Sequence, residues 1–188
     1  MKILVLGGAG YIGSHVARQL AQRGHTPVIF DNLRKGHRQA AGDIEFIYGD
    51  LQDVQLLEDL FAQQKFDAVM HFAAHSLVGE SVKHPDWYFR NNVANALNLL
   101  DAMRRHNVNN LVFSSTAAVY GEPREIPISE DHPKAPTNPY GESKLMVEMI
   151  LQRYRKAYGL RSTSLRYFNA AGADPSGELG EDHRPATH

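Results

Sequence analysis

The sequence has no cysteine in its 188 residues, which excludes disulfide bonds and cysteine-based catalysis. It also lacks a strong charge of either sign, because 20 Lys and Arg residues nearly balance 21 Asp and Glu residues. The formal net charge of −1, without a basic stripe, argues against a nucleic-acid partner bound through its phosphates. Neither a signal peptide nor a long apolar run is present, so we expect no membrane association and a cytoplasmic location.

Histidine is plentiful, with ten residues, but its pattern does not indicate a metal site. His71 and His75 lie around the end of an expected strand, not along one helix face, and no carboxylate accompanies them at a ligand spacing. We therefore expect no bound metal. The hydrophobic content of 43% is enough for one substantial core, which predicts one domain with an appendage.

A glycine cluster near the N-terminus is the first strong motif. Residues 2–6 form a short apolar run typical of a buried parallel strand, and residues 11–23 have the pattern of a helix. Gly7 and Gly10 lie between the expected strand and helix, and Gly13 lies in the first turn of the helix. Such glycines let the backbone and the helix N-terminus approach a pyrophosphate. A glycine cluster can also be only a flexible turn, but its place between a strand and a helix favours a dinucleotide-binding loop.

An acidic residue follows at the position that selects the cofactor. The next expected strand, residues 27–31, ends at Asp31, about 20 residues beyond the glycine loop, where an acid holds the ribose hydroxyls. Because a carboxylate repels a 2′-phosphate, Asp31 favours NAD over NADP. Arg34 and Lys35 lie close by in sequence and keep NADP open as an alternative.

Strand and helix patterns alternate along the whole chain. We expect strands at residues 2–6, 27–31, 44–48, 67–72, 110–115 and 162–167, and helices at residues 11–23, 53–64, 88–106 and 140–158. This alternation predicts an α/β fold with a doubly wound parallel sheet of the Rossmann type, whose ligands bind at the carboxyl ends of the strands. The residues that fall there are Asp50, Ala73, Ala74, Ser114, Ser115, Thr116 and Asn169.

Tyr140 and Lys144 form the candidate catalytic pair. A spacing of four residues on a helix puts both side chains on one face, where an ammonium can stabilise a phenolate. Most such pairs are ordinary solvated residues of a helix surface. Beside a dinucleotide site, however, an activated tyrosine indicates hydride chemistry with the tyrosine as the base.

These motifs together resemble the UDP-glucose 4-epimerases, within the extended short-chain dehydrogenase/reductase group. The resemblance runs the whole length of the chain, and the combination points to sugar-nucleotide epimerases more than to other branches. The strings that carry it are Gly-Gly-Ala-Gly-Tyr-Ile-Gly-Ser-His at 7–15, Asp-Asn-Leu at 31–33, His-Phe-Ala-Ala at 71–74, Val-Gly-Glu-Ser at 78–81, Asn-Asn-Val at 91–93, Phe-Ser-Ser-Thr-Ala-Ala-Val-Tyr-Gly at 113–121, Pro-Tyr-Gly-Glu-Ser-Lys at 139–144 and Leu-Arg-Tyr-Phe-Asn at 165–169.

The resemblance implies NAD as the cofactor and a UDP-sugar as the substrate. The implied NAD contacts run from the pyrophosphate through the adenosine to the nicotinamide: Gly7, Gly10, Tyr11, Ile12, Gly13, Asp31, Asn32, Asp50, Leu51, Phe72, Ala73, Ala74, Asn91, Ser114, Tyr140, Lys144 and Tyr167. The implied catalytic triad is Thr116, Tyr140 and Lys144, and the implied substrate contacts are Thr116, Tyr140 and Asn169.

The implied reaction inverts carbon 4 of the sugar through a transient 4-keto sugar. Tyr140 takes the proton of the 4-hydroxyl while hydride moves to the nicotinamide, and Thr116 bonds the same oxygen. Dehydratases of the group carry an Asp-Glu pair where this chain has Ala117 and Ala118, so dehydration is disfavoured. A UDP-sugar decarboxylase, a different 4-epimerase, and a protein that binds NAD without turnover stay open as alternatives.

The resemblance also bears on domains and assembly. Residues 1–168 are expected to form the NAD-binding domain, and residues 169–188 to begin a substrate-binding region that lies largely outside this chain. The helix expected from Tyr140 onward is too apolar to have one face in water. It either packs deeply on the sheet or also meets the helix at 88–106 across a two-fold axis, which would make a homodimer.

Overall fold

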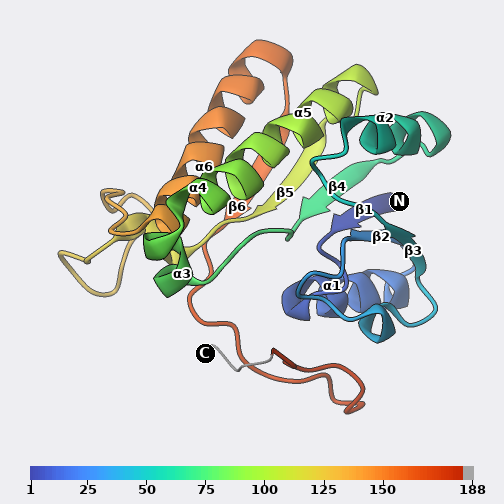
Figure 1. Cartoon of the computed structure of the whole chain (residues 1–188), viewed down its shortest axis with the longest axis horizontal. Coiled ribbons are helices and arrows are strands. Elements are labelled where there is room, and N and C mark those ends of the chain that lie inside the picture. Colours follow the sequence, from blue (N-terminus) through green and yellow to red (C-terminus); the bar gives the residue numbers. More distant parts are fainter. Residues whose placement is uncertain (184–188) are drawn as a thin grey trace.

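The computed structural model describes residues 1–183 and shows one parallel sheet with helices packed on it (Figure 1). The sheet has six strands in the order β3-β2-β1-β4-β5-β6, and every pairing is parallel. The strands are β1 (Lys2–Leu6), β2 (Thr26–Asp31), β3 (Glu45–Tyr48), β4 (Ala68–His71), β5 (Asn110–Ser114) and β6 (Arg161–Leu165). The strand order reverses direction next to β1, which places a ligand crevice at the carboxyl ends of β1 and β4.

Six α-helices and three other helical segments lie between the strands in the described residues. The α-helices are α1 (Tyr11–Gln22), α2 (Val54–Gln63), α3 (Val78–Lys83), α4 (Pro85–Tyr88), α5 (Asn95–Arg105) and α6 (Pro139–Tyr158). A π-helical segment, Phe89–Ala94, joins α4 to α5, and 3₁₀ turns occupy Arg38–Ala41 and Ala117–Tyr120. The doubly wound α/β fold expected from the sequence is confirmed.

The expected elements differ from the observed ones mainly at their ends. Strand β4 ends at His71 because the N–H groups of Phe72 and Ala73 both turn to the carbonyl of Leu6. Strand β6 ends at Leu165, not at residue 167, since its partner β5 ends at Ser114. Helix α3 was not expected, because six residues are too few to show apolar periodicity.

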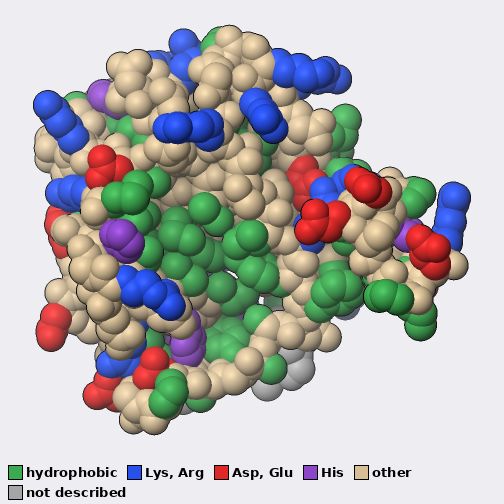
Figure 2. Space-filling view, turned by 180° about the vertical axis from the view of Figure 1, so that it is seen from behind, with side chains coloured by type: hydrophobic (Ala, Val, Ile, Leu, Met, Phe, Trp, Pro, Cys, Tyr) green, Lys and Arg blue, Asp and Glu red, His purple; other side chains and the backbone are tan. Residues whose placement is uncertain are grey.

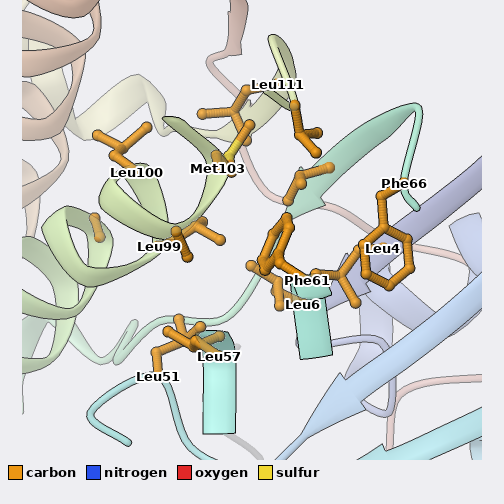
Figure 3. Packing of buried hydrophobic residues seen from close by; sticks show 14 of the residues in the cluster. Leu4, Leu6, Leu51, Leu57, Phe61, Phe66, Leu99, Leu100, Met103 and Leu111 are labelled. Atoms are coloured by element: carbon orange, nitrogen blue, oxygen red, sulfur yellow. The ribbon is translucent and has the colours of Figure 1, made fainter. Parts of the chain in front are cut away.

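The two faces of the sheet have separate cores, which follows from the alternation of side chains along each strand. Leu4 and Leu6 of β1 belong to the larger core beneath α2, α5 and α6, part of which Figure 3 shows. Ile3 and Val5 point the other way, into the smaller core beneath α1. Helix α1 packs on this second face, and its N-terminus lies at the glycine turn that follows β1.

The smaller-core face is less covered beside β4, β5 and β6. Met70 and Val112 are only half-buried there, and Leu165 is exposed. Viewed from behind, the molecule shows hydrophobic side chains gathered near the centre of this side (Figure 2). Parallel sheets are usually covered on both faces, so this region resembles an interior surface. Residues 184–188, the end of the expected substrate-region segment, lie outside the described residues.

Candidate active site

The glycine turn is sterically fixed between β1 and α1. Gly7 has a φ of 73°, and a Cβ atom there would lie 2.6 Å from the backbone nitrogen of Ala73. A Cβ atom on Gly13 would lie 2.2 Å from the carbonyl oxygen of Gly7. Gly10 is the N-cap of α1 and provides no side-chain cap, so the first turn of the helix keeps N–H groups for an anion. Tyr11 and Ile12 begin the helix and are half-buried.

Asp31 ties the end of β2 to this turn. Its Oδ2 accepts a hydrogen bond from the N–H of Ala9 across 3.0 Å, and its Oδ1 accepts one from Leu33 across 2.8 Å. Burial raises the pKa of the Asp31 carboxyl, and these two hydrogen bonds oppose the rise. The bond to Ala9 was not expected from the sequence, and it gives Asp31 a structural role beside the expected contact with ribose.

The residues expected around the adenosine lie beside Asp31. The side-chain amide of Asn32 donates to Oδ2 of Asp50 across 2.6 Å, which joins the ends of β2 and β3. Leu51 is buried next to Asp50 in the larger core. Sequence reasoning did not assign Gln52, Trp87, Arg90 and Asn95 to this site, because the pocket is formed by segments that only the fold brings together. The pocket is lined by Arg34, Asp50, Gln52, His75, Trp87, Arg90, Asn91 and Asn95.

The segment after β4 passes between the glycine turn and α6. Phe72, Ala73 and Ala74 are half-buried, and the N–H of Ala73 bonds the carbonyl of Leu6 across 3.1 Å. This contact sets the segment beside the glycine turn, where the expected cofactor would cross the sheet edge. Asn91 is half-buried and donates to the side chain of Asn92.

Asn92 holds this segment in place, a role that sequence reasoning did not assign. Its Oδ1 accepts from the N–H of His75 across 2.8 Å, and its Nδ2 donates to the carbonyl of His75 across 3.0 Å. The same Nδ2 donates to Ser143 Oγ on α6, also across 3.0 Å. The Asn-Asn-Val string already contained Asn92, but its contacts join positions too distant in the chain to be read from the sequence.

The three expected catalytic residues come from β5 and α6 and lie at one end of the sheet. Thr116 follows β5, and its hydroxyl accepts a hydrogen bond from the N–H of Ala118. Tyr140 lies in the first turn of α6, and Lys144 lies one turn later with its side chain buried. The ammonium of Lys144 donates to the carbonyl of Ser114 across 2.8 Å and lies 4.9 Å from the ring centre of Phe113.

Burial is the largest influence on the pKa of both Tyr140 and Lys144. Burial raises the pKa of the Tyr140 phenol, and a hydrogen bond with Thr116 lowers it. Burial lowers the pKa of Lys144 to about 7, so its charge is only partly present at neutral pH. Burial thus favours the neutral forms of both side chains, and a further positive group near Tyr140 would favour its ionised form.

The last expected site residues follow β6. The carbonyl of Tyr167 accepts a hydrogen bond from the N–H of Ala117 across 2.7 Å, so Tyr167 is brought next to Thr116. Burial raises the pKa of the Tyr167 phenol. Asn169 is exposed two residues further on. Within residues 1–183, no three His, Asp or Glu side chains group closely enough to hold a metal, and no helix is long and apolar enough to cross a membrane.

The strand-order reversal next to β1, the fixed glycine turn and the acid that ends β2 are the features of a Rossmann-type fold. Residues 3–186 match the family described as the NAD dependent epimerase/dehydratase family, and the chain belongs to that family.

Relatives within the family agree with the resemblance found in the sequence. The UDP-glucose 4-epimerase of Halalkalibacterium halodurans is 55% identical over 188 residues, which are 100% of this chain and 56% of that protein. The crystal structure of the Brucella ovis UDP-glucose 4-epimerase in complex with NAD has a TM-score of 0.97 at 50% identity, covering 100% of this chain and 57% of that one. The Bifidobacterium longum enzyme in complex with NAD⁺ and UDP has a TM-score of 0.94 at 40% identity, covering 98% of this chain and 58% of that one. This chain thus spans little more than half the length of these relatives.

Proposed function

We propose that this chain binds NAD and that the whole protein to which it corresponds interconverts UDP-glucose and UDP-galactose by 4-epimerisation. The observation that carries the proposal is the convergence of Thr116, Tyr140 and Lys144 at the sheet edge that also holds the fixed glycine turn. Relatives named UDP-glucose 4-epimerase, with structures in complex with NAD and UDP, support it.

The residues present fit a dinucleotide. The first turn of α1 offers unpaired N–H groups to the pyrophosphate, and Asp31 and Asn32 offer acceptors to the adenosine ribose. The anionic Asp31 disfavours the 2′-phosphate of NADP. Bound NAD⁺ would supply the hydride acceptor and a positive charge near Tyr140.

The chain's own residues move the proton. The Tyr140 oxygen would take the proton of the sugar 4-hydroxyl, and the Thr116 hydroxyl would hold the same sugar oxygen by a hydrogen bond. Lys144, fixed on the Ser114 carbonyl, would add positive charge that favours the ionised tyrosine. When the 4-keto sugar turns over, carbon 4 would take the hydride back on its other face while the same tyrosine returns the proton to oxygen 4, so no net oxidation takes place.

The residues after Thr116 favour epimerisation over elimination of water. Ala117 and Ala118 begin the 3₁₀ turn that follows Thr116, and neither can act as an acid or a base. A UDP-sugar decarboxylase or another 4-epimerase would use the same triad. A comparison of turnover with UDP-hexoses, UDP-N-acetylhexosamines and UDP-pentoses would separate these alternatives.

The domain boundary, assembly and location belong to the same proposal. We place the NAD-binding domain at residues 1–168 and the start of a substrate region at residues 169–188. The weakly covered sheet face beside β4 to β6 is where we expect the remaining length of the family to pack. A homodimer through α5 and α6 and a cytoplasmic location complete the proposal.

The decisive experiment fuses this chain to the C-terminal part of a relative such as the Halalkalibacterium halodurans enzyme. The fusion protein is then assayed for turnover of UDP-glucose with no added cofactor. We expect UDP-galactose to form, and Tyr140→Phe to lower turnover by a factor on the order of 10² or more while NAD stays bound. A Tyr140→Phe enzyme with unchanged turnover would show that the triad is not the catalyst. The 188-residue chain alone is expected to bind NAD without turnover.

A further inference from the structure

An ion pair between buried Glu148 and half-buried Arg166 lies next to the proposed catalytic residues. The carboxylate of Glu148, a residue of α6 that is only 4% exposed, meets the guanidinium of Arg166 through two bonds. Nε of Arg166 donates to Oε1 across 3.0 Å, and Nη2 donates to Oε2 across 2.7 Å. The Ser115 hydroxyl donates to Oε1 as well, across 2.5 Å. Glu148 therefore receives three hydrogen bonds from two other segments of the chain, those after β5 and after β6.

Both segments place a site residue next to the residue that bonds Glu148. Ser115 precedes Thr116, and Arg166 precedes Tyr167. The backbones are tied to each other, since the N–H of Ser115 bonds the carbonyl of Leu165 across 2.9 Å. The pair thus fixes each segment one residue before a site residue, Thr116 in one and Tyr167 in the other.

Glu148 lies in the same row of α6 side chains as Tyr140 and Lys144. Tyr140, Lys144 and Glu148 follow one another at intervals of four residues, which sets them on one face of α6. Tyr140 and Lys144 are at the site, and Glu148 is one turn further along. A change in the position of Glu148 therefore acts on the same helix face that presents the tyrosine.

Arg166 also connects the pair to the long loop before α6. Its Nη1 donates to the Tyr120 hydroxyl across 2.7 Å and to the carbonyl of Glu130 across 3.3 Å. The guanidinium lies 5.1 Å from the ring centre of Tyr120. One arginine thus joins the segment after β6, helix α6, and two points, Tyr120 and Glu130, of the region between β5 and α6.

We propose that Glu148 and Arg166 are positioning residues, which hold the end of β5 against α6 so that the Thr116 hydroxyl stays on the Tyr140 phenol. The inference deepens the proposed function, because it assumes that Tyr140 is the base. A pair with only a structural role would stabilise the fold without affecting the ionisation of Tyr140. A positioning pair affects that ionisation, because the hydrogen bond with Thr116 favours the phenolate.

The test follows Tyr140 in the 188-residue chain labelled with 3-fluorotyrosine, whose phenol ionises at lower pH than tyrosine. The fluorine NMR signal of Tyr140 is assigned by its loss in Tyr140→Phe, and its chemical shift is followed against pH without ligand. Glu148→Gln is the main variant. Ser115→Ala is the milder one, since it removes one hydroxyl and leaves the ion pair in place. Both variants keep the ionisable neighbours of Tyr140. These are Lys144 and Tyr88, and the ring centre of Tyr88 is 6.5 Å from that of Tyr140.

Glu58→Gln is the matched control, because it removes the carboxylate of another glutamate–arginine pair, with Arg105, far from the site. We expect Glu148→Gln to move the Tyr140 titration to higher pH, Ser115→Ala to move it less in the same direction, and Glu58→Gln to leave it unchanged. Identical titrations in Glu148→Gln and the unaltered chain would overturn the proposal. If Glu148→Gln does not fold, an unchanged titration in Ser115→Ala would overturn it. The measurement needs neither NAD nor a sugar, so a failure of the proposed function stays distinguishable.

Discussion

The carboxylate of Asp31 accepts a hydrogen bond from the backbone N–H of Ala9, so the residue expected to select the cofactor also fixes the turn expected to bind the pyrophosphate. The two parts of the dinucleotide site are therefore coupled through one side chain. Burial of Asp31 costs its charged form some stability, and the bonds from Ala9 and Leu33 offset that cost. Substitution of Asp31 should consequently change both the choice and the strength of cofactor binding.

Asp31→Ser is expected to narrow the preference for NAD over NADP by about tenfold, or about 1.4 kcal/mol, because the repulsion of the 2′-phosphate is lost. NAD itself should bind more weakly, since the glycine turn loses the bond to Ala9. Calorimetric titration with both cofactors measures the two effects. Asp43→Ser, at an exposed position in the same region, is the control and should change neither. Tighter binding of NADP than NAD by the unaltered chain would contradict the role of Asp31.

The glycine turn allows a matched pair of substitutions. Gly13→Ala should abolish NAD binding or folding, because its Cβ atom would lie 2.2 Å from the Gly7 carbonyl oxygen. Gly10→Ala should fold normally, because its Cβ atom meets no atom of the chain closer than 3.3 Å, and should bind NAD more weakly but measurably, because the pyrophosphate is expected to pass close to this residue. Circular dichroism checks folding and calorimetry checks binding. Equal binding by the two variants would mean that the close approach at Gly13 has no role.

The elements and the main motifs of this fold could be predicted from the sequence because their signals are local. The apolar run of β1 and the glycines after it are contiguous, and the spacing of Tyr140 and Lys144 is that of one helix turn. The contacts of Asn92 with His75 and Ser143 could not be predicted, because they join segments brought together only by the folded sheet.

The protonation states of Tyr140 and Lys144 could not be predicted from the sequence either. The spacing of Tyr140 and Lys144 gives their common helix face, but the pKa of each depends on how deeply it is buried and on which group it bonds. The structure sets the ammonium of Lys144 on the Ser114 carbonyl, buries Lys144 and half-buries Tyr140, so desolvation is the largest effect on both pKa values.

The lowered pKa of Lys144 predicts a pH dependence of folding. Its pKa is about 7 in the folded chain and about 10.4 when unfolded, so between these values only the unfolded state holds the proton. Stability from this residue therefore rises as pH increases through that window, by about 1.4 kcal/mol per pH unit at most. We expect the free energy of unfolding, measured with urea from pH 7 to 9, to rise with pH for the unaltered chain and not for Lys144→Met. Lys156→Met, at an exposed position of the same helix, should keep the rise. Parallel pH profiles for the chain and Lys144→Met would contradict it.

The proposed dimer depends on apolar side chains exposed on α5 and α6. Met146 and Met149 are 42% and 54% exposed on α6, and Leu97 is 37% exposed on α5. The two helices are neighbours, joined by the bond from the Tyr154 hydroxyl to Asp101. Charge on this face should prevent its burial against a second copy, because an unpaired carboxylate would be desolvated there. Met146→Glu combined with Met149→Glu is therefore expected to give a monomer where the unaltered chain gives a dimer, as measured by light scattering at tens of micromolar. Gln152→Glu, at an exposed position of the same helix, should leave the mass unchanged, and a monomeric mass for the unaltered chain at that concentration would refute the dimer.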